Sequence, residues 1–254
     1  MDINLLTNNT LFIMKKTFLL LSAVALCAAC VFSSCKKDEP NKGGLKGGEG
    51  EETKLHESLK GSSYVVINLD DASFNHIASK VAQDLRVDDV TRHLYVWDGT
   101  YAGGTCAGVN FYGEAAEWTS LVVTNIGWSG AGWFNDNETP AIASDAADLA
   151  NWKFHVAYKG AAGKAHIINL YWNGGTYKFA IGEGSLDDAG ASYSAIAPVS
   201  GKFVANDWNE YEVALTDTGM DYSKAGKSDN IVGVLSGGVQ GTTVDLDAMF
   251  FYKK

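Results

Sequence analysis

The chain has 254 residues, 46% of them hydrophobic, which is enough to form the core of one large domain or of two small ones. Its formal net charge is −10, from 30 acidic and 20 basic residues. This charge repels phosphate backbones and excludes nucleic acid as a partner. Glycine is frequent, at 28 residues, and proline is rare, at 3, so we expect the turns to be made largely by glycine.

Residues 1–35 have the pattern of an export signal. Lys15 and Lys16 precede an apolar run over 18–29, which is short for a membrane span. Met14 opens this pattern directly, and we therefore expect it to be the true start of the protein.

A cysteine follows small residues at the end of the signal. Cys35 comes directly after Ser33 and Ser34, and Cys30 comes after two alanines. This arrangement resembles a bacterial lipobox, in which the thiol of the new first residue is lipidated. We expect lipidation at Cys35, with Cys30 as the competing position and an ordinary signal peptide as the alternative.

The segment 36–62 is predicted to be a flexible tether. It is rich in glycine, lysine and glutamate and has no aromatic residue, so it has too little apolar surface to fold. It begins with Lys36-Lys37-Asp38-Glu39, and charged residues directly after the cysteine resemble those of surface lipoproteins of the Bacteroidota. The resemblance implies an outer-membrane protein, anchored by lipid and displayed on the cell surface.

The remainder, 63–254, is predicted to be an all-β domain with one short helix. The helix begins near Ser73, with Ile77, Val81 and Leu85 on one stripe. Asn173-Gly174 predicts a hairpin turn, and no βαβ rhythm is present. The pattern therefore favours a two-sheet antiparallel β-sandwich of the jelly-roll kind. The expected strands cover 64–69, 93–98, 105–112, 120–126, 152–158, 166–172, 176–181, 210–215, 230–235 and 242–252.

The stretch 93–134 concentrates aromatic residues and glycines. Two turns are expected in it, 97–101 and 127–133, and loops and strand ends are where sandwiches usually carry binding residues. An indole ring offers a flat apolar face to the C–H face of a sugar, and a carboxylate accepts hydroxyl protons. Each ring has core packing as its alternative. The candidate ligand-binding residues are Trp97, Asp98, Tyr101, Trp128 and Trp133.

Three segments resemble the carbohydrate-binding, galactose-binding-like β-sandwiches. They are an early strand that ends in acidic residues (68–71), a late strand after a tryptophan-marked loop (206–213) and a final strand with acidic and apolar residues in alternation (243–251). The resemblance covers 63–254 and implies polysaccharide or oligosaccharide as the partner. It also implies a structural calcium ion that links the first and last strands, held by Asp70, Asp71, Asp245 and Asp247. The alternative is that the first pair caps a helix while the second pair faces water.

Two other functions stay open at this point, and the first is a glycoside hydrolase or lyase on a β-sandwich. A glycoside hydrolase needs two carboxylates across the scissile bond, and Glu114, Glu117 and Asp98 are the candidates near the aromatic cluster. No nucleophile elbow or phosphate-binding loop occurs, so we expect a non-catalytic protein. The third hypothesis is a structural or protein-binding module of the cell envelope.

Overall fold

The computed structural model describes residues 55–86, 94–114, 117–184, 186, 192–236 and 239–254. The chain falls into two units, and the first, Met1–Ser33, lies wholly outside these ranges. The predicted signal peptide, lipidation site Cys35 and most of the tether therefore lie outside the described residues. No helix in the described ranges is both long and apolar enough to cross a membrane.

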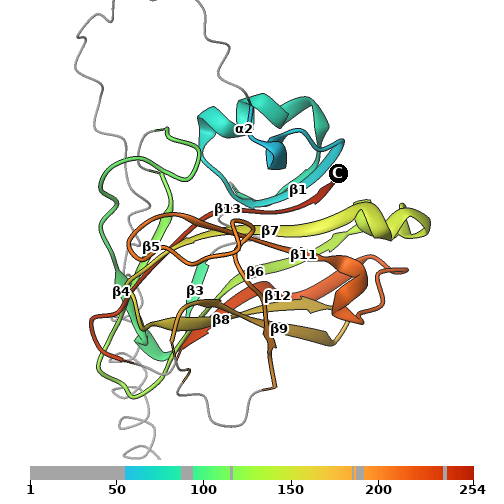
Figure 1. Cartoon of the computed structure of the whole chain (residues 1–254). Helices are drawn as coiled ribbons and strands as arrows, with labels where there is room; N and C mark the ends of the chain where they lie inside the picture. The colour runs from blue at the N-terminus through green and yellow to red at the C-terminus, as the bar shows by residue number, and fades with distance from the viewer. Residues whose placement is uncertain (1–54, 87–93, 115–116, 185, 187–191, 237–238) are drawn as a thin grey trace, which may run out of the picture. The chain divides into compact units, whose positions relative to one another are not determined.

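The domain is a β-sandwich, as predicted, with its two sheets drawn one above the other in Figure 1. Sheet A has seven strands, with β11-β7-β13-β1-β2 in sequence across it, while β5 pairs with the start of β13 and β4 pairs with β5. Its strands are β1 (Ser63–Asn68), β2 (Val81–Asp84), β4 (Tyr101–Gly103), β5 (Thr119–Val123), β7 (Trp152–Lys159), β11 (Asn209–Ala214) and β13 (Thr243–Lys253).

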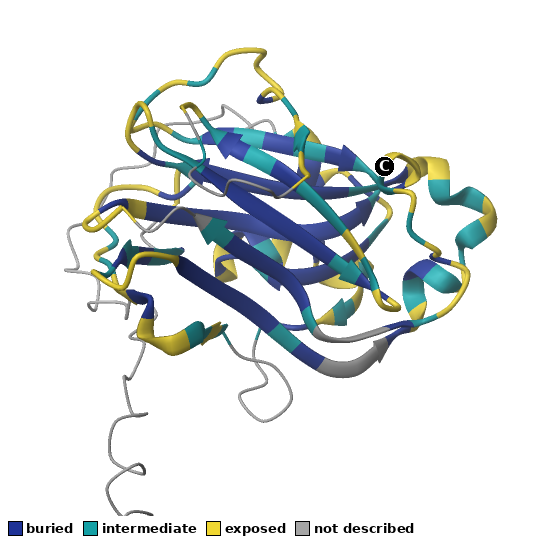
Figure 2. Ribbon diagram, turned by 90° about the horizontal axis from the view of Figure 1, so that it is seen from below, coloured by how far each residue is buried: buried dark blue, intermediate teal, exposed yellow. Residues whose placement is uncertain are grey.

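Sheet B has six strands, in the order β10-β9-β8-β12-β6-β3. They are β3 (Leu94–Val96), β6 (Ser129–Thr139), β8 (Ala165–Trp172), β9 (Gly175–Gly182), β10 (Ser194–Ala195) and β12 (Gly226–Ser236). Figure 2 views the domain from the side of this sheet, and the strands are largely buried while the connecting loops are exposed. Most pairings are antiparallel, but β1 pairs with β2 and β9 pairs with β10 in parallel, which the prediction did not include.

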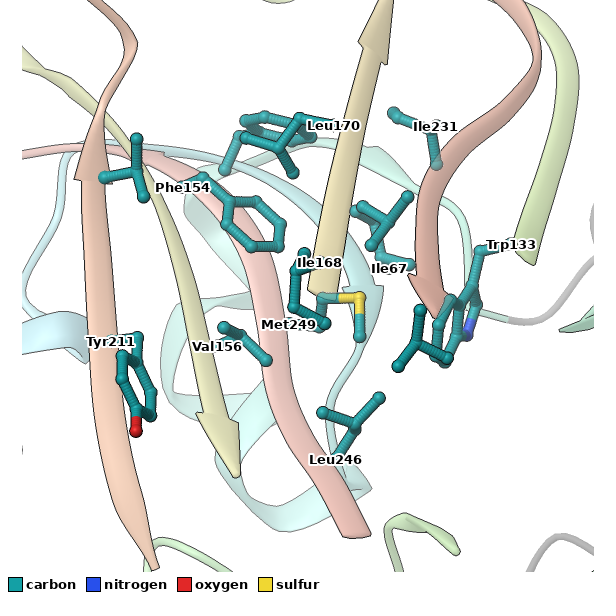
Figure 3. Close-up of a cluster of buried hydrophobic side chains, with 14 of the residues drawn as sticks. Ile67, Trp133, Phe154, Val156, Ile168, Leu170, Tyr211, Ile231, Leu246 and Met249 are labelled. Atoms are coloured by element: carbon teal, nitrogen blue, oxygen red, sulfur yellow. The ribbon is translucent and has the colours of Figure 1, made fainter. Parts of the chain in front are cut away.

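The main core fills the space between the sheets. Figure 3 shows side chains from both sheets that meet there, with Trp133 among them. A second cluster lies on the outer side of sheet A, where α2 (Asp71–Ile77) and η1 (Glu57–Leu59) cover β1 and β13 (Figure 1). Leu59 is 2% exposed in that cluster, so the folded part begins before position 63 and includes the end of the predicted tether.

The short connecting elements complete the chain. They are η2 (Ala78–Lys80), η3 (Trp97–Gly99), α3 (Pro140–Ala143), η4 (Ala146–Asn151) and η5 (Leu215–Thr218). The hairpin at Asn173-Gly174 is confirmed, because both residues have positive φ, 49° and 78°, as this tight turn requires.

Three local predictions were wrong. The helix stops at Ile77, because Val81 joins a strand that pairs with β1 instead of continuing the helical stripe. Residues 105–112 form a loop, and the segment 127–133, expected as a turn, contains the start of β6.

Candidate functional site

A row of paired residues crosses the outer face of sheet B. Tyr95 pairs with Gly132, Gly132 with Gly233, Gly233 with Asn169, and Asn169 with Lys178. Directly paired residues lie on the same face of a sheet. Because Ala131 and Trp133 point into the core, these neighbours point away from it. The middle of this face is therefore made of glycine backbone.

Two indole rings fill the space that the glycines of β6 leave. A methyl group added at Gly130 would lie 2.4 Å from Cε3 of Trp97 and 2.9 Å from Cζ3 of Trp128. A methyl group at Gly132 would lie 3.0 Å from Cζ2 of Trp97. The Trp97 ring thus lies across both glycines, with Trp128 beside it. Side chains at these two positions would prevent the close approach.

Thr100 fixes the segment that carries Trp97. It is fully buried, and its Oγ1 lies 2.7 Å from the Trp97 carbonyl oxygen and 3.0 Å from that of Gly130, so its single proton can be donated to either. The Gly130 amide donates to the same Oγ1 at 3.0 Å. Asp98 between them has φ 50° and is exposed, which turns the chain so that Trp97 lies back over β6.

A third ring lies on the other side of the row. A methyl group at Gly233 would lie 3.2 Å from the Tyr171 ring. The Tyr171 hydroxyl accepts a hydrogen bond of 2.9 Å from Nδ2 of Asn169, which holds the ring in place. Oδ1 of Asn169 is buried without a hydrogen-bond partner, and Asn230 places its amide oxygen over Gly132. Two amides therefore lie among the rings.

We call this surface the aromatic platform. Its rings are Tyr95, Trp97, Trp128 and Tyr171, and its floor is Gly130, Gly132 and Gly233. Tyr95 is 56% exposed and Trp128 is 38% exposed, while Trp97 and Tyr171 are half-buried. Flat rings with hydrogen-bonding amides among them suit a flat ligand that has one apolar face and polar edges.

The structure separates the predicted ligand residues into two groups. Trp97 and Trp128 lie at the platform, and Asp98 is the exposed residue next to Trp97. Tyr101 and Trp133 are 3% and 2% exposed and pack in the core between the sheets, so neither presents a ring face to a ligand, and we withdraw them. The reason is strand alternation: Trp133 lies two residues from Ala131, on the inner face of β6.

Sequence reasoning missed Tyr95, Tyr171 and Asn169 as site residues. Asn169 and Tyr171 are two residues apart on β8 and therefore share a face, which was the available signal. Their meeting with β6 depends on the strand order β8-β12-β6, which joins segments distant in the sequence.

The four aspartates proposed for calcium are not gathered into one site. Within the described part of the chain, no group of three or more acidic, histidine or cysteine side chains is placed to hold a metal ion. Asp71 pairs with Arg86 at 3.3 Å, and Asp245 pairs with Lys159 at 3.6 Å. Asp70 caps α2 by accepting from the Ser73 amide, which was the alternative to metal binding.

Asp247 is fully buried on the outer side of sheet A, and its carboxylate is held by backbone amides. Oδ2 accepts from Phe111 at 2.9 Å and Oδ1 from Ala248 at 2.7 Å. Burial, together with the nearby Asp70 charge, raises the pKa of Asp247 to about 7, although the two amide donors act in the opposite direction. Each oxygen of the Asp247 carboxyl group therefore has a hydrogen-bond partner within the fold, and its role is structural.

Two of the carboxylates considered for catalysis, Glu117 and Asp98, belong to different faces of the sandwich. Oε2 of Glu117 accepts from the Asp71 amide at 3.3 Å, at the start of α2 on the outer side of sheet A. Asp98 follows Trp97 directly in η3, the segment whose indole lies over the outer face of β6. The structure does not bring these two across one cleft, as a glycoside hydrolase would require.

Comparisons with known proteins give distant similarities. No family model and no curated protein matches the chain. Among solved structures, it is similar to a family 11 carbohydrate-binding module from Clostridium thermocellum in complex with a mixed-linked tetrasaccharide, at 8% identity over 67% of this chain and 93% of that one, with a TM-score of 0.38.

Two further solved structures are similar at the same level. A family 30 carbohydrate-binding module of a C. thermocellum cellulosomal cellulase has 15% identity over 63% of this chain and 86% of that one, with a TM-score of 0.39. An exo-β-agarase has 9% identity over 76% of this chain and only 25% of its own length, with a TM-score of 0.42. Because these scores are below 0.5, the functional proposal rests on the geometry of the platform.

Proposed function

We propose that the chain is a non-catalytic glycan-binding protein that holds polysaccharide or oligosaccharide on the aromatic platform. The observation that supports this most strongly is the arrangement of Trp97 and Trp128 over Gly130, with Trp128 exposed. Glycine at this position lets both rings lie close to the sheet.

The chemistry of the platform matches that of a sugar ring. A pyranose has an apolar C–H face, which stacks on an aromatic ring, and hydroxyl groups around its edge. Stacked rings supply the contact area, while the amides of Asn169 and Asn230 and the carboxylate of Asp98 supply acceptors for hydroxyl protons. The buried Oδ1 of Asn169 lacks a donor, and a hydroxyl that reached it would remove this penalty.

Non-catalytic binding is favoured by the kind of polar group on this face. Asn169 and Asn230 neither donate nor take up a proton at neutral pH, so they orient hydroxyls without acting as a general acid or base. Lys178, also in the row, adds a donor at one end. The glycoside hydrolase hypothesis would need a second carboxylate opposite Asp98.

We further propose that the protein is anchored through lipid on Cys35 and displayed on the outside of the outer membrane. The support is the run of basic, apolar and small residues before Cys35 and the charged residues after it. A tether that is rich in glycine and charge would hold the platform away from the membrane, where it meets external polymers. Cys35→Ala should abolish labelling of the expressed protein by an alkyne-tagged fatty acid, whereas Cys30→Ala should leave it. The opposite result would assign the lipid to Cys30.

Affinity gel electrophoresis with a panel of neutral polysaccharides tests the binding proposal. We expect at least one glycan to retard the protein, and Trp128→Ala to restore most of the mobility. The matched control is Trp208→Ala, since Trp208 is a half-buried tryptophan that packs against Trp118 on the outer side of sheet A. The proposal would be contradicted if no glycan retarded the protein, or if Trp128→Ala and Trp208→Ala lost retardation to the same extent.

A further inference from the structure

A second cavity lies at one end of the sandwich, away from the aromatic platform. Its volume is about 470 Å³, and it is formed where β7 ends, β8 approaches and β13 begins. The loop before β13 and Asn206 complete its wall. The polar residues that line it include Lys159, Lys164, Asn206, Gln240, Thr242 and Asp245.

Asp245 gives the cavity a buried acceptor. The residue is only 7% exposed, and its Oδ2 lies 3.6 Å from Nζ of Lys159. Its other oxygen, Oδ1, is buried and has no hydrogen-bond partner. Burying a carboxylate oxygen without a hydrogen-bond donor costs free energy. A ligand hydroxyl that donates a hydrogen bond to this oxygen would remove that cost.

Lys159 is held in place by its neighbours. Besides the ion pair with Asp245, its ammonium lies 4.1 Å from the centre of the Trp118 ring and 4.6 Å from that of Trp208. Cation–π contacts of this kind fix the ammonium without neutralising it.

Lys164 adds a second positive charge. It is half-buried, and it makes no ion pair with any of the residues that the structure describes. With Lys159 balanced by Asp245, the cavity lining keeps one excess positive charge, although the whole chain carries a net charge of −10. A local reversal of charge in a concave site favours an anionic ligand.

We propose that this cavity is a separate binding site for a small carboxylate-bearing sugar, of the uronic acid class. The ligand carboxylate would pair with Lys164, and a ring hydroxyl would donate to Oδ1 of Asp245. The amides of Asn206 and Gln240 and the Thr242 hydroxyl offer further hydrogen bonds to hydroxyl groups. The cavity has room for a ligand of this size.

The acid is favoured over its neutral parent because a neutral sugar leaves Lys164 without an anion. A free amino acid carries the same carboxylate but only an ammonium to meet Asp245, where Lys159 already lies. The proposal is independent of the platform, because no platform residue lines the cavity.

Saturation-transfer NMR on the full chain tests this site, with sodium galacturonate, galactose and L-alanine as probes. We expect saturable binding of galacturonate, weaker binding of galactose, and no competition by L-alanine. Lys164→Gln should weaken galacturonate binding about fivefold and remove its preference over galactose. Lys80→Gln, which removes an exposed lysine of η2 that does not line the cavity, should leave both signals unchanged and so separates the loss of the Lys164 ammonium from a general loss of positive charge.

Asp245→Asn is the second variant and should weaken both sugars, with circular dichroism as a check on folding. Because Asp245 is buried and this variant can misfold, Lys164→Gln is the deciding variant. Absence of galacturonate binding, equal binding of galactose, displacement by L-alanine, or unchanged preference in Lys164→Gln would each overturn the proposal.

Discussion

Replacing Gly130 by alanine should damage the platform without destroying the sandwich. The new methyl group would lie 2.4 Å from Cε3 of Trp97 and 2.9 Å from Cζ3 of Trp128. Carbon atoms in contact prefer a separation of about 3.5–4.0 Å, so both rings must move outward by roughly 1 Å. Thr100 resists this movement, because its hydroxyl joins the Trp97 segment to Gly130.

The expected cost has two parts. Overpacking of this kind destabilises a fold by about 1–3 kcal/mol, which denaturant unfolding measures. The second part is a loss of glycan affinity, which is larger in relative terms. Trp128 is 38% exposed, so covering its free surface removes roughly 90 Å² from water. This area corresponds to about 2 kcal/mol, or roughly a 30-fold change in Kd, as an upper limit if the tilted ring loses all of the contact.

Gly103→Ala is the matched control. Gly103 is also a strand glycine, but nothing lies within 4 Å of an added methyl group there. We expect this variant to keep the near-ultraviolet circular dichroism, stability and glycan affinity of the parent protein. If Gly130→Ala also kept all three, the close packing of Trp97 and Trp128 on Gly130 would be refuted as the basis of the platform.

Two further predictions concern buried polar groups. Thr100→Val should lower the free energy of unfolding by about 1–3 kcal/mol, measured in denaturant, because the Gly130 amide loses its acceptor in the core; an unchanged midpoint would contradict the role given to Thr100. Asp247 has a folded-state pKa of about 7 against an ordinary value of 3.8, so between these pH values the folded state binds one more proton than the unfolded state. The contribution of Asp247 to the free energy of unfolding therefore falls as the pH rises from about 4 to 7, and it is constant above pH 7. Asp247→Asn should remove this part of the pH dependence, measured as unfolding free energy across that window, and a difference between the two proteins that does not vary with pH would count against the shifted pKa.

The sandwich could be predicted because its strands carry local signals. Alternation over 152–158 matches β7, and the Asn173-Gly174 turn matches the β8–β9 hairpin. The helix after Asp70 was predicted too long, since Val81 satisfies both a helical stripe and a parallel strand beside β1. Only the tertiary pairing decides between these outcomes.

The site was predictable only in part, because it depends on contacts between distant segments. The sequence selected Trp97 and Trp128 as candidate rings at two separate turns, whereas the structure places both rings over Gly130 and makes the glycines of 129–132 part of β6. These glycines lie in β6 because two indole rings pack against that strand, and no local pattern in the sequence shows this packing. Tyr171 is joined to the same face through β12, and its part in the platform depends on strand order alone.

The acidic residues illustrate the same limit. Asp245 and Asp247 alternate on β13 as expected, yet one pairs with Lys159 and the other accepts two backbone amides. A sequence shows the spacing of carboxylates but not which cations and amides the fold brings to them.

The central claim is that glycan lies on the rings of the platform, and hydroxyl-radical footprinting tests it most directly. With a retarding polysaccharide present at saturation, oxidation of Trp128 and Tyr95 should fall several-fold, because these rings are 38% and 56% exposed in the protein alone. Oxidation of Trp208, on the side of sheet A, should not change. Protection of Trp208 with unchanged oxidation of Trp128 and Tyr95 would contradict the account.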